Sequence, residues 1–496
     1  MNTAWKTPPE LLGLAPIESL IGEPIPSASP ESDLAQQGLA LELSRFANSD
    51  AGNAERFQAM YGSNVRHVAE SGQWLVWDGA RWLPDTSGEV VRLFIATMRE
   101  LGAQAFRHDD FKVREELAKY ALKCTNNDKV RSGLEMAKSI LGMTVRVTEL
   151  DSDPWLVGTP NGVIDLRTGS PVAPDRRQLI TKSIGTPYVA GAECPRWLDF
   201  IDTVTAGDRE LAEYLQAAVG YSLTGLCREQ CLFFLHGTGC NGKGVFSETI
   251  KRLVGDYGQT APESLFTRDR NSSATNDVAR LAGCRLAIAA ELDEGSAFAE
   301  SRIKALTGGD TITARFLHKE FFDFAPTHKF WISGNHKPTV RGTDQGIWRR
   351  LRLVPFTVRI ADEKKDPALV EKLAGEMPGI LNWALSGCAV WQRHGLTTPG
   401  CVRRATEDYR REEDVIGQFL ADCTVETPGT RTPTTSIFQR YGQWCAREGI
   451  LPRYQLCARR LIRRIEEHGH VRSKNNGTPV WVGLGVARSG ELGEDI

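Results

Sequence analysis

The N-terminal third of the chain alternates between strand-like and helix-like spacing of its apolar residues. Trp74 to Trp77 form a short apolar run, and Asp78-Gly79 follows it before Arg81-Trp82. Because Asp-Gly readily supplies the positive-φ backbone of a tight turn, this pattern predicts a β-hairpin. Its three tryptophans could stack on nucleic-acid bases, but we favour packing within a small domain. Apolar residues at three- and four-residue intervals then predict helices over residues 91–150.

The middle of the chain has the pattern of an α/β domain. Residues 155–167 predict two strands joined by a turn at Asn161-Gly162, and residues 197–222 predict helix. From residue 230 to about residue 360, continuous apolar strands alternate with helical segments. Strands in such an alternation form a sheet that helices cover.

The two ends of the chain differ from this middle region. Residues 1–48 are rich in proline and more acidic than basic, which predicts a loosely ordered leader. Residues 431–490 carry 11 Lys and Arg against 3 Asp and Glu. They predict a helix around Ile437–Glu448, a second helix over Gln455–Glu467, a turn at Asn475-Asn476-Gly477 and a strand at Val480–Val482.

This C-terminal order of two helices and a β-wing is that of a winged helix. The second helix of such a domain can enter the major groove of DNA, and here it carries Arg459, Arg460, Arg463 and Arg464. A basic, solvated face on a small packing domain is the alternative. We favour contact with DNA.

Composition excludes several classes of protein. The 496 residues are 41% hydrophobic and 25% charged, with a formal charge of -2, as expected for several globular domains. Any nucleic-acid surface must therefore be local. The 11 cysteines include no CxxC pair, which excludes a zinc ribbon and favours reduced thiols. No apolar run approaches the ~20 residues that cross a bilayer, and no signal sequence is present. We expect a cytoplasmic protein without a membrane partner.

The strongest chemical motif follows the apolar strand Cys231–Leu235. A glycine-rich loop leads into a helix there, which is the context of a phosphate-binding loop. Its backbone N–H groups would cradle phosphates, while Lys243 reaches the β and γ oxygens. Gly244 replaces the Ser or Thr whose hydroxyl would bind Mg²⁺, and Ser247 lies too far along the helix to substitute. The nucleotide-binding candidates are Gly237, Thr238, Gly239, Cys240, Asn241, Gly242, Lys243, Gly244 and Val245.

Polar side chains beside other strands complete a possible hydrolytic site. Glu291 follows the apolar strand that starts at Arg285, where a carboxylate would hold Mg²⁺-bound water and polarise the attacking water. Asn335 follows another strand, and its amide could orient the attacking water. Arg349 and Arg350 precede a further strand, and guanidinium groups suit the charge of a transferring phosphoryl group.

These motifs, taken in order, resemble a known family. GTGCNGKG, RLAIAAELDE, KALTGGDTITARFLHKEF, FWISGNHKP and GIWRRLRLVPF are similar to the superfamily 3 helicase motor. The resemblance is to the phage and plasmid primase–helicase group, which is related to the poxvirus replication NTPase, and it covers roughly residues 45–360. It implies an α/β fold with a P-loop AAA+-like helicase motor, an N-terminal α+β region and a C-terminal winged-helix-like domain.

The pattern and the resemblance together divide the chain into five expected regions. These are a flexible leader (1–48), an N-terminal accessory and helical domain (49–220), the P-loop ATPase motor (221–365), a helical connector (366–425) and a basic winged-helix-like DNA-binding domain (426–496).

The resemblance also implies roles for individual residues. Lys243 and its loop would be the Walker A motif, Glu291 the Walker B acid and metal ligand, and Asn335 the sensor. Arg350, with Arg349, would reach an ATP on the neighbouring subunit, which implies a ring, expected to be a homo-hexamer. The segment Lys304–Phe321 would carry a pore hairpin whose Arg315, His318 and Lys319 contact single-stranded DNA.

The implied function is an ATP-dependent DNA helicase of a phage, prophage or plasmid replication system, with ATP and Mg²⁺ as cofactors. The basic C-terminal region would contact origin or forked duplex DNA. Because only about 45 residues precede the matching region, we expect a separate primase and host replication proteins as partners. The alternative is a DNA-dependent ATPase that binds an origin or assembles without separating strands. A small-molecule kinase would need an arginine-rich lid, and the rest of the chain does not fit it.

Overall fold

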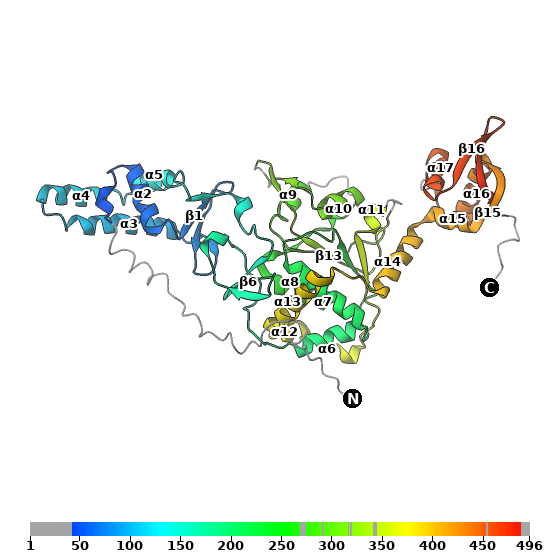
Figure 1. Cartoon of the computed structure of the whole chain (residues 1–496), viewed down its shortest axis with the longest axis horizontal. Helices are drawn as coiled ribbons and strands as arrows, with labels where there is room; N and C mark the ends of the chain where they lie inside the picture. The colour runs from blue at the N-terminus through cyan, green and yellow to red at the C-terminus, as the bar shows by residue number, and fades with distance from the viewer. Residues whose placement is uncertain are drawn as a thin grey trace. The chain divides into compact units, whose positions relative to one another are not determined.

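The computed structural model describes residues 42–267, 274–289, 292–315, 317, 320–340, 345–452 and 455–487. Most of the expected leader therefore lies outside the described residues. The chain divides into two compact units, residues up to 150 with 174–181, and residues 151–173 with those from 182 onward (Figure 1). Among the described residues, no helix has the length and apolar character needed to cross a membrane.

The smaller unit combines helices with a mixed sheet in the order β3-β2-β1-β4. The predicted hairpin is confirmed, because β2 and β3 are antiparallel with Trp77 opposite Trp82. Both side chains are buried, at 8% and 0% exposure, so they pack inside the unit. The elements are α2 (Asp50–Tyr61), β1 (Val65–Val68), β2 (Trp74–Trp77), β3 (Trp82–Pro84), α3 (Glu89–Ala105), α4 (Phe111–Lys123), α5 (Asn127–Ala137), β4 (Thr144–Val145) and the 3₁₀ turn η5 (Arg176–Gln178).

The larger unit begins with a small antiparallel sheet of β5 (Leu156–Thr159), β6 (Gly162–Asp165) and β7 (Ser170–Val172). The two predicted strands are confirmed, but the turn is displaced by one residue. Thr159 pairs with Gly162, so Pro160 and Asn161 form the turn and Gly162 opens the next strand.

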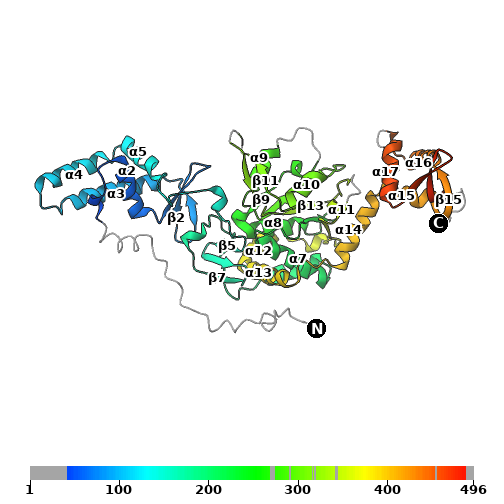
Figure 2. The same ribbon diagram turned by 45° about the horizontal axis from the view of Figure 1, so that its top comes forward.

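The centre of the larger unit is a five-stranded parallel sheet in the order β14-β8-β13-β10-β9. Helices cover both faces of the sheet (Figure 2), so its strands are almost wholly apolar. Alternate residues of each strand enter the two cores on opposite sides of the sheet. The sheet strands are β8 (Leu232–His236), β9 (Gly258–Thr260), β10 (Leu286–Ala289), β13 (Lys329–Gly334) and β14 (Leu351–Pro355).

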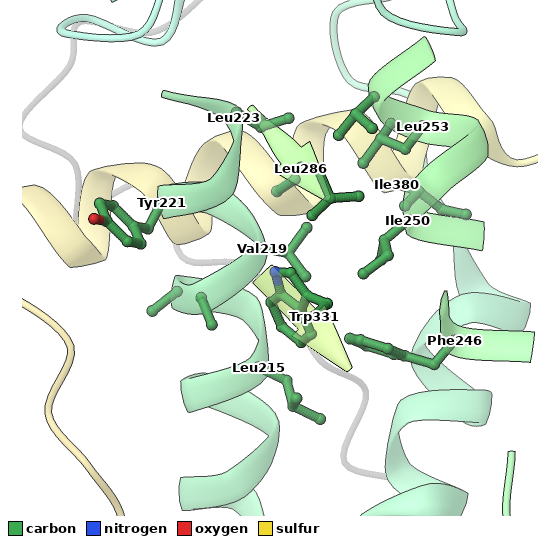
Figure 3. Packing of buried hydrophobic residues seen from close by; sticks show 14 of the residues in the cluster. Leu215, Val219, Tyr221, Leu223, Phe246, Ile250, Leu253, Leu286, Trp331 and Ile380 are labelled. Carbon is green, nitrogen blue, oxygen red and sulfur yellow. The ribbon is translucent and has the colours of Figure 1, made fainter. Parts of the chain in front are cut away.

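One face of this sheet is covered by α6, α7, α8 and α13. Figure 3 shows Leu215 and Val219 of α7, Phe246 and Ile250 of α8 and Trp331 of β13 meeting in a single apolar core. The helices α6 and α7 therefore belong with the sheet, although their sequence was expected to lie in the preceding domain. The bounds are α6 (Pro195–Val204), α7 (Arg209–Leu223), α8 (Lys243–Val254), α12 (Leu369–Ala374) and α13 (Met377–His394).

The opposite face carries a second core formed with α9, α10, α11 and α14. A short antiparallel hairpin of β11 and β12 follows α10. The bounds are α9 (Ala274–Ala279), α10 (Glu300–Thr307), β11 (Ile312–Ala314), β12 (Phe322–Phe324), α11 (Gln345–Trp348) and α14 (Gly400–Glu413).

The C-terminal region has a core of its own, built around Phe419, Tyr441, Trp444 and Trp481. Its order is helix, strand, two helices and two strands, and the three strands form an antiparallel sheet β15-β17-β16. The elements are α15 (Val415–Cys423), β15 (Thr424–Pro433), α16 (Thr434–Arg447), α17 (Ala458–Glu467), β16 (Val471–Asn475) and β17 (Thr478–Val486).

Candidate functional site

The order of the parallel strands makes the carboxyl end of β8 the expected position of a ligand site. The chain leaves β8 and reaches β9 at one edge of the sheet, whereas it leaves β13 and crosses to β14 at the other edge. Such a change of direction leaves a crevice outside the strand ends, and this is where open α/β sheets bind ligands. The glycine-rich loop, residues 237–242, begins at that point.

Two glycines of this loop sit where no side chain fits. A Cβ at Gly237 would lie 2.2 Å from the Phe356 backbone oxygen, and one at Gly242 would lie 2.5 Å from Val204 Cγ1. Gly242 also has a φ of 87°, in the left-handed region that favours glycine. The loop is further tied to the end of β14, because Asn241 Nδ2 donates to Phe356 O at 3.0 Å.

Lys243 joins the loop to the end of the neighbouring strand β13. Its buried Nζ donates to Gly237 O at 2.6 Å, to Asn241 Oδ1 at 3.2 Å and to Asn335 Oδ1 at 3.0 Å. The structure thus brings Lys243 and Asn335 together, although 92 residues separate them. An ammonium group at the start of a helix can exchange these oxygen acceptors for phosphate oxygens.

The oxygen donors around this lysine suit Mg²⁺, which prefers oxygen ligands. Ser247 Oγ lies 3.0 Å from Ser333 Oγ of β13. Among the described residues, and apart from the chain neighbours and the helix's own backbone, no atom lies within 4 Å of a Cβ built at Gly244. In the described part of the chain, no group of three or more His, Cys, Asp or Glu residues could hold a metal by itself. Glu291, the expected acidic ligand, lies outside the described residues.

His236 lies at the last position of β8 and was not singled out by sequence reasoning. Burial, together with the charges of Lys337 and Lys243, lowers its pKa below the usual value. The only sequence feature that could have marked His236 as a candidate is its position directly before the glycine-rich loop.

The adjacent arginines Arg349 and Arg350 occupy different environments. Arg350 is only 7% exposed, and its guanidinium donates to Thr307 Oγ1 at 3.1 Å and to Gly346 O at 2.7 Å. Arg349 is exposed, and its Nη2 lies 3.3 Å from Gln230 Oε1.

Both arginines are distant from the loop of their own chain. They precede β14, which runs parallel to β8 with Leu351 opposite Leu232 and Pro355 opposite His236. Five residues of strand at about 3.3 Å each put roughly 16 Å between Arg350 and the edge where the loop begins. Neither side chain crosses that distance.

The expected pore hairpin corresponds to β11, β12 and their connection. Its strands pair Ile312 with Phe324 and Ala314 with Phe322. Arg315 is exposed, with its Cζ 4.8 Å from the centroid of the Phe321 ring. Leu317 and Phe321 are 72% and 58% exposed. The tip therefore presents apolar and cationic groups together, while His318 and Lys319 lie outside the described residues.

The three candidate arginines of the C-terminal region lie on the outer face of α17. Arg459, Arg460 and Arg463 are exposed, whereas Leu461 and Ile465 face the core. Arg463 Nε donates to Glu467 Oε1 at 3.0 Å, which partly neutralises that position. Arg459 and Arg460 have no such carboxylate partner among the described residues.

Comparison with known families and proteins gives this geometry a context. A family model described as D5 N terminal like matches residues 54–206, and a family of unknown function (DUF5906) matches residues 235–350. The protein named "Putative helicase L207/L206" from Acanthamoeba polyphaga mimivirus is 27% identical over 419 residues, which cover 76% of this chain and 43% of that protein. The protein named "Putative primase C962R" from African swine fever virus (isolate Pig/Kenya/KEN-50/1950) is 23% identical over 351 residues, covering 64% and 36%.

A solved structure with a similar fold is the apo C terminal region of NrS-1. It has a TM-score of 0.50 and 9% sequence identity, and the match covers 87% of this chain and 99% of that one. The likeness concerns the fold. This chain spans less than half the length of the viral relatives described above. The D5-type match and the viral relatives named helicase or primase therefore show that this chain is similar to D5-like primase–helicase proteins.

Proposed function

We propose that this chain is an ATP-dependent DNA helicase motor of a phage, prophage or plasmid replication system, moving on single-stranded DNA as a ring. The observation that carries the proposal is the contact between Lys243 Nζ and Asn335 Oδ1 at the end of the sheet. It joins a phosphate-type loop to the polar end of the adjacent strand. Nucleoside triphosphate hydrolysis requires both parts, one to hold the phosphates and one to orient water.

In this proposal, ATP binds at the carboxyl end of β8. The backbone N–H groups of residues 237–243 hold the β-phosphate, and Lys243 leaves its three oxygen acceptors for the β and γ oxygens. Asn335, released by the lysine, turns its amide to the attacking water. Glu291 accepts the proton of that water as the bond between the β and γ phosphates breaks. Mg²⁺, when bound, neutralises charge on the phosphates.

The arginines before β14 act on the nucleotide of a neighbouring subunit. Since Arg349 and Arg350 lie about 16 Å from the loop edge of their own chain, they can contribute to hydrolysis only in trans. Arg349 is the exposed member of the pair, so it is the group presented to the neighbour. Arg350 is internal and links α10 to α11 through Thr307 and Gly346. A closed ring, such as a hexamer, supplies every site with such a neighbour.

Single-stranded DNA would contact the tip of the β11–β12 hairpin. Arg315 supplies positive charge, and the exposed Phe321 ring offers a surface on which a base can stack. His318 and Lys319 of the same connection are proposed to contact the DNA backbone. Duplex DNA, at an origin or fork, would contact the outer face of α17 through Arg459 and Arg460, with β16 and β17 as a wing.

Stimulation of ATP hydrolysis by single-stranded DNA tests this proposal. We expect oligo(dT) to raise the hydrolysis rate of the full chain and to leave a Lys243→Ala variant inactive. The second candidate function, an assembly factor that binds an origin without separating strands, is favoured by the separate basic C-terminal domain. Strand displacement from a forked duplex distinguishes the two, because only the helicase releases the labelled strand.

A further inference from the structure

The tryptophan hairpin of the smaller unit carries two arginines on its ring faces. Arg66 Cζ lies 4.9 Å from the centroid of the Trp82 ring, and Arg176 Cζ lies 5.6 Å from that of Trp77. The two rings contact each other edge to face, with centroids 5.5 Å apart. The two indole rings are therefore buried, and the guanidinium groups of Arg66 and Arg176 lie over their faces.

Both guanidiniums are fixed in place by the fold. Arg66 Nη1 donates to the carbonyl oxygens of Gly62 and Val65, and Arg176 Nε donates to Asn64 Oδ1 at 3.0 Å. The backbone of Arg176 is held in turn, because its carbonyl accepts from Trp82 Nε1 at 3.0 Å. The terminal nitrogens Nη1 and Nη2 of Arg176 have no protein acceptor in the described part of the chain. Donors that are fixed and partly unused suit an external anion.

The acid beside the pair, Asp175, is shared, because its hydrogen bond with Arg177 and the charges of Arg177 and Arg176 all lower its pKa. Neither Arg66 nor Arg176 forms an ion pair with a carboxylate of the described residues, and the neighbouring Asp175 is bonded to Arg177 at 2.5 Å. Burial and the charge of Arg176 lower the pKa of Arg66. Two half-buried like charges are unfavourable unless an anion joins them.

We propose that Arg66 and Arg176 form a phosphodiester-binding site that holds the backbone of a nucleic acid. Its identification with single-stranded DNA rests on the proposed function. Both guanidiniums are half-buried at the surface, so a chain of phosphates can lie across them, whereas the buried Trp77 and Trp82 rings are closed to bases. The site binds without reading sequence, since phosphate contacts carry no base information.

Salt-dependent binding of labelled oligo(dT) to the full chain without ATP tests this site. An R66Q/R176Q variant removes both donors, and R177Q is the matched control, because its side chain is 91% exposed and already bonded to Asp175. Each phosphate contact on a single strand contributes about 0.7 to the slope of log affinity against log salt. We expect the slope to fall by about 1.4 in R66Q/R176Q and to stay at the parent value in R177Q.

Equal slopes for R66Q/R176Q and R177Q would overturn the proposal. So would displacement of oligo(dT) by inorganic phosphate beyond that by chloride at matched ionic strength, because the pair would then be a free-anion site. If the double variant fails to fold, R176Q alone carries the test with an expected fall of about 0.7. The proposed function fails separately, if DNA does not stimulate ATP hydrolysis by the parent chain.

Discussion

Adding one methyl group at Gly242 of the glycine-rich loop and at Gly244 of helix α8 should have opposite effects on stability. At Gly242 the backbone has a φ of 87°, and a new Cβ would lie 2.5 Å from Val204 Cγ1 and 3.0 Å from Phe200 Cε2, both in the buried core of α6. Left-handed backbone costs a side chain about 1–2 kcal/mol, and overpacking adds about 1–3 kcal/mol. Gly242→Ala should therefore lower the free energy of unfolding by about 2–5 kcal/mol.

Gly244→Ala adds the same methyl group in open space. Beyond its own helix backbone and chain neighbours, no atom of the part of the chain that the structure describes lies within 4 Å of its Cβ, and the residue is the second of helix α8. Alanine in a helix is more favourable than glycine by up to about 1 kcal/mol, so this variant should be slightly more stable than the parent. Urea unfolding measures both values. Titration with a fluorescent ATP analogue should also show at least tenfold weaker binding by Gly242→Ala, because the loop must move to relieve the clash.

Equal unfolding free energies for the two variants would refute this reasoning. They would mean that the loop does not hold its left-handed turn against α6, and the backbone geometry on which the phosphate site rests would be wrong. A loss of nucleotide binding without a loss of stability would instead locate the effect in the loop alone.

Three further predictions concern other residues of the motor. Gly244→Ser places a hydroxyl at the position where the phosphate-loop pattern has Ser or Thr, so the Mg²⁺ concentration that half-saturates ATP hydrolysis should fall several-fold. Gly244→Ala is the control. If both variants change this Mg²⁺ concentration equally, the hydroxyl has no role. Arg350→Ala should lower the free energy of unfolding by about 1–3 kcal/mol, because it loses buried hydrogen bonds. Arg349→Ala should unfold like the parent but lower the kcat of ATP hydrolysis. Equal unfolding curves for the two variants would contradict this prediction. Burial lowers the pKa of His328 to about 3, so below pH 6.5 the unfolded chain binds more protons than the folded chain. The free energy of unfolding should therefore fall by about 2 kcal/mol on acidification to pH 5. In urea unfolding, His328→Gln should make this free energy less dependent on pH.

The parallel sheet could be predicted from the sequence because both of its faces are buried. A strand such as Leu232–His236 is then apolar at successive positions, and the glycine-rich loop directly after it is visible without a structure. The C-terminal strands were predicted only in part. Strand β16 (Val471–Asn475) is exposed along its whole length, so neither its burial nor its alternation marked it as a strand.

Other features depend on contacts that local sequence does not carry. Arg285 and Lys329 begin two apolar strands, yet both are buried, because they donate to carbonyl oxygens at the end of α7, Leu223 O and Thr224 O respectively. Arg349 and Arg350 are neighbours in sequence, yet the side chain of Arg349 is exposed and that of Arg350 is buried. No local pattern predicts these environments.

The candidate site was likewise predictable from the sequence only in part. The position of Asn335 at the end of an apolar strand made it a candidate before its partner was known. Its contact with Lys243 follows from two strands being adjacent in the sheet, which depends on strand order rather than on either segment. The pair of Arg66 and Arg176 could not be predicted, because the two residues come from distant segments that meet on one hairpin.

The most direct test of the central claim is ATP hydrolysis by the full chain with and without single-stranded DNA. The parent is compared with Lys243→Ala and with the double variant His318→Ala/Lys319→Ala. We expect DNA to stimulate the parent, Lys243→Ala to be inactive, and the hairpin variant to keep its basal rate while losing the stimulation. Hydrolysis that ignores DNA in every variant would contradict a translocating motor and leave an ATP-gated assembly protein.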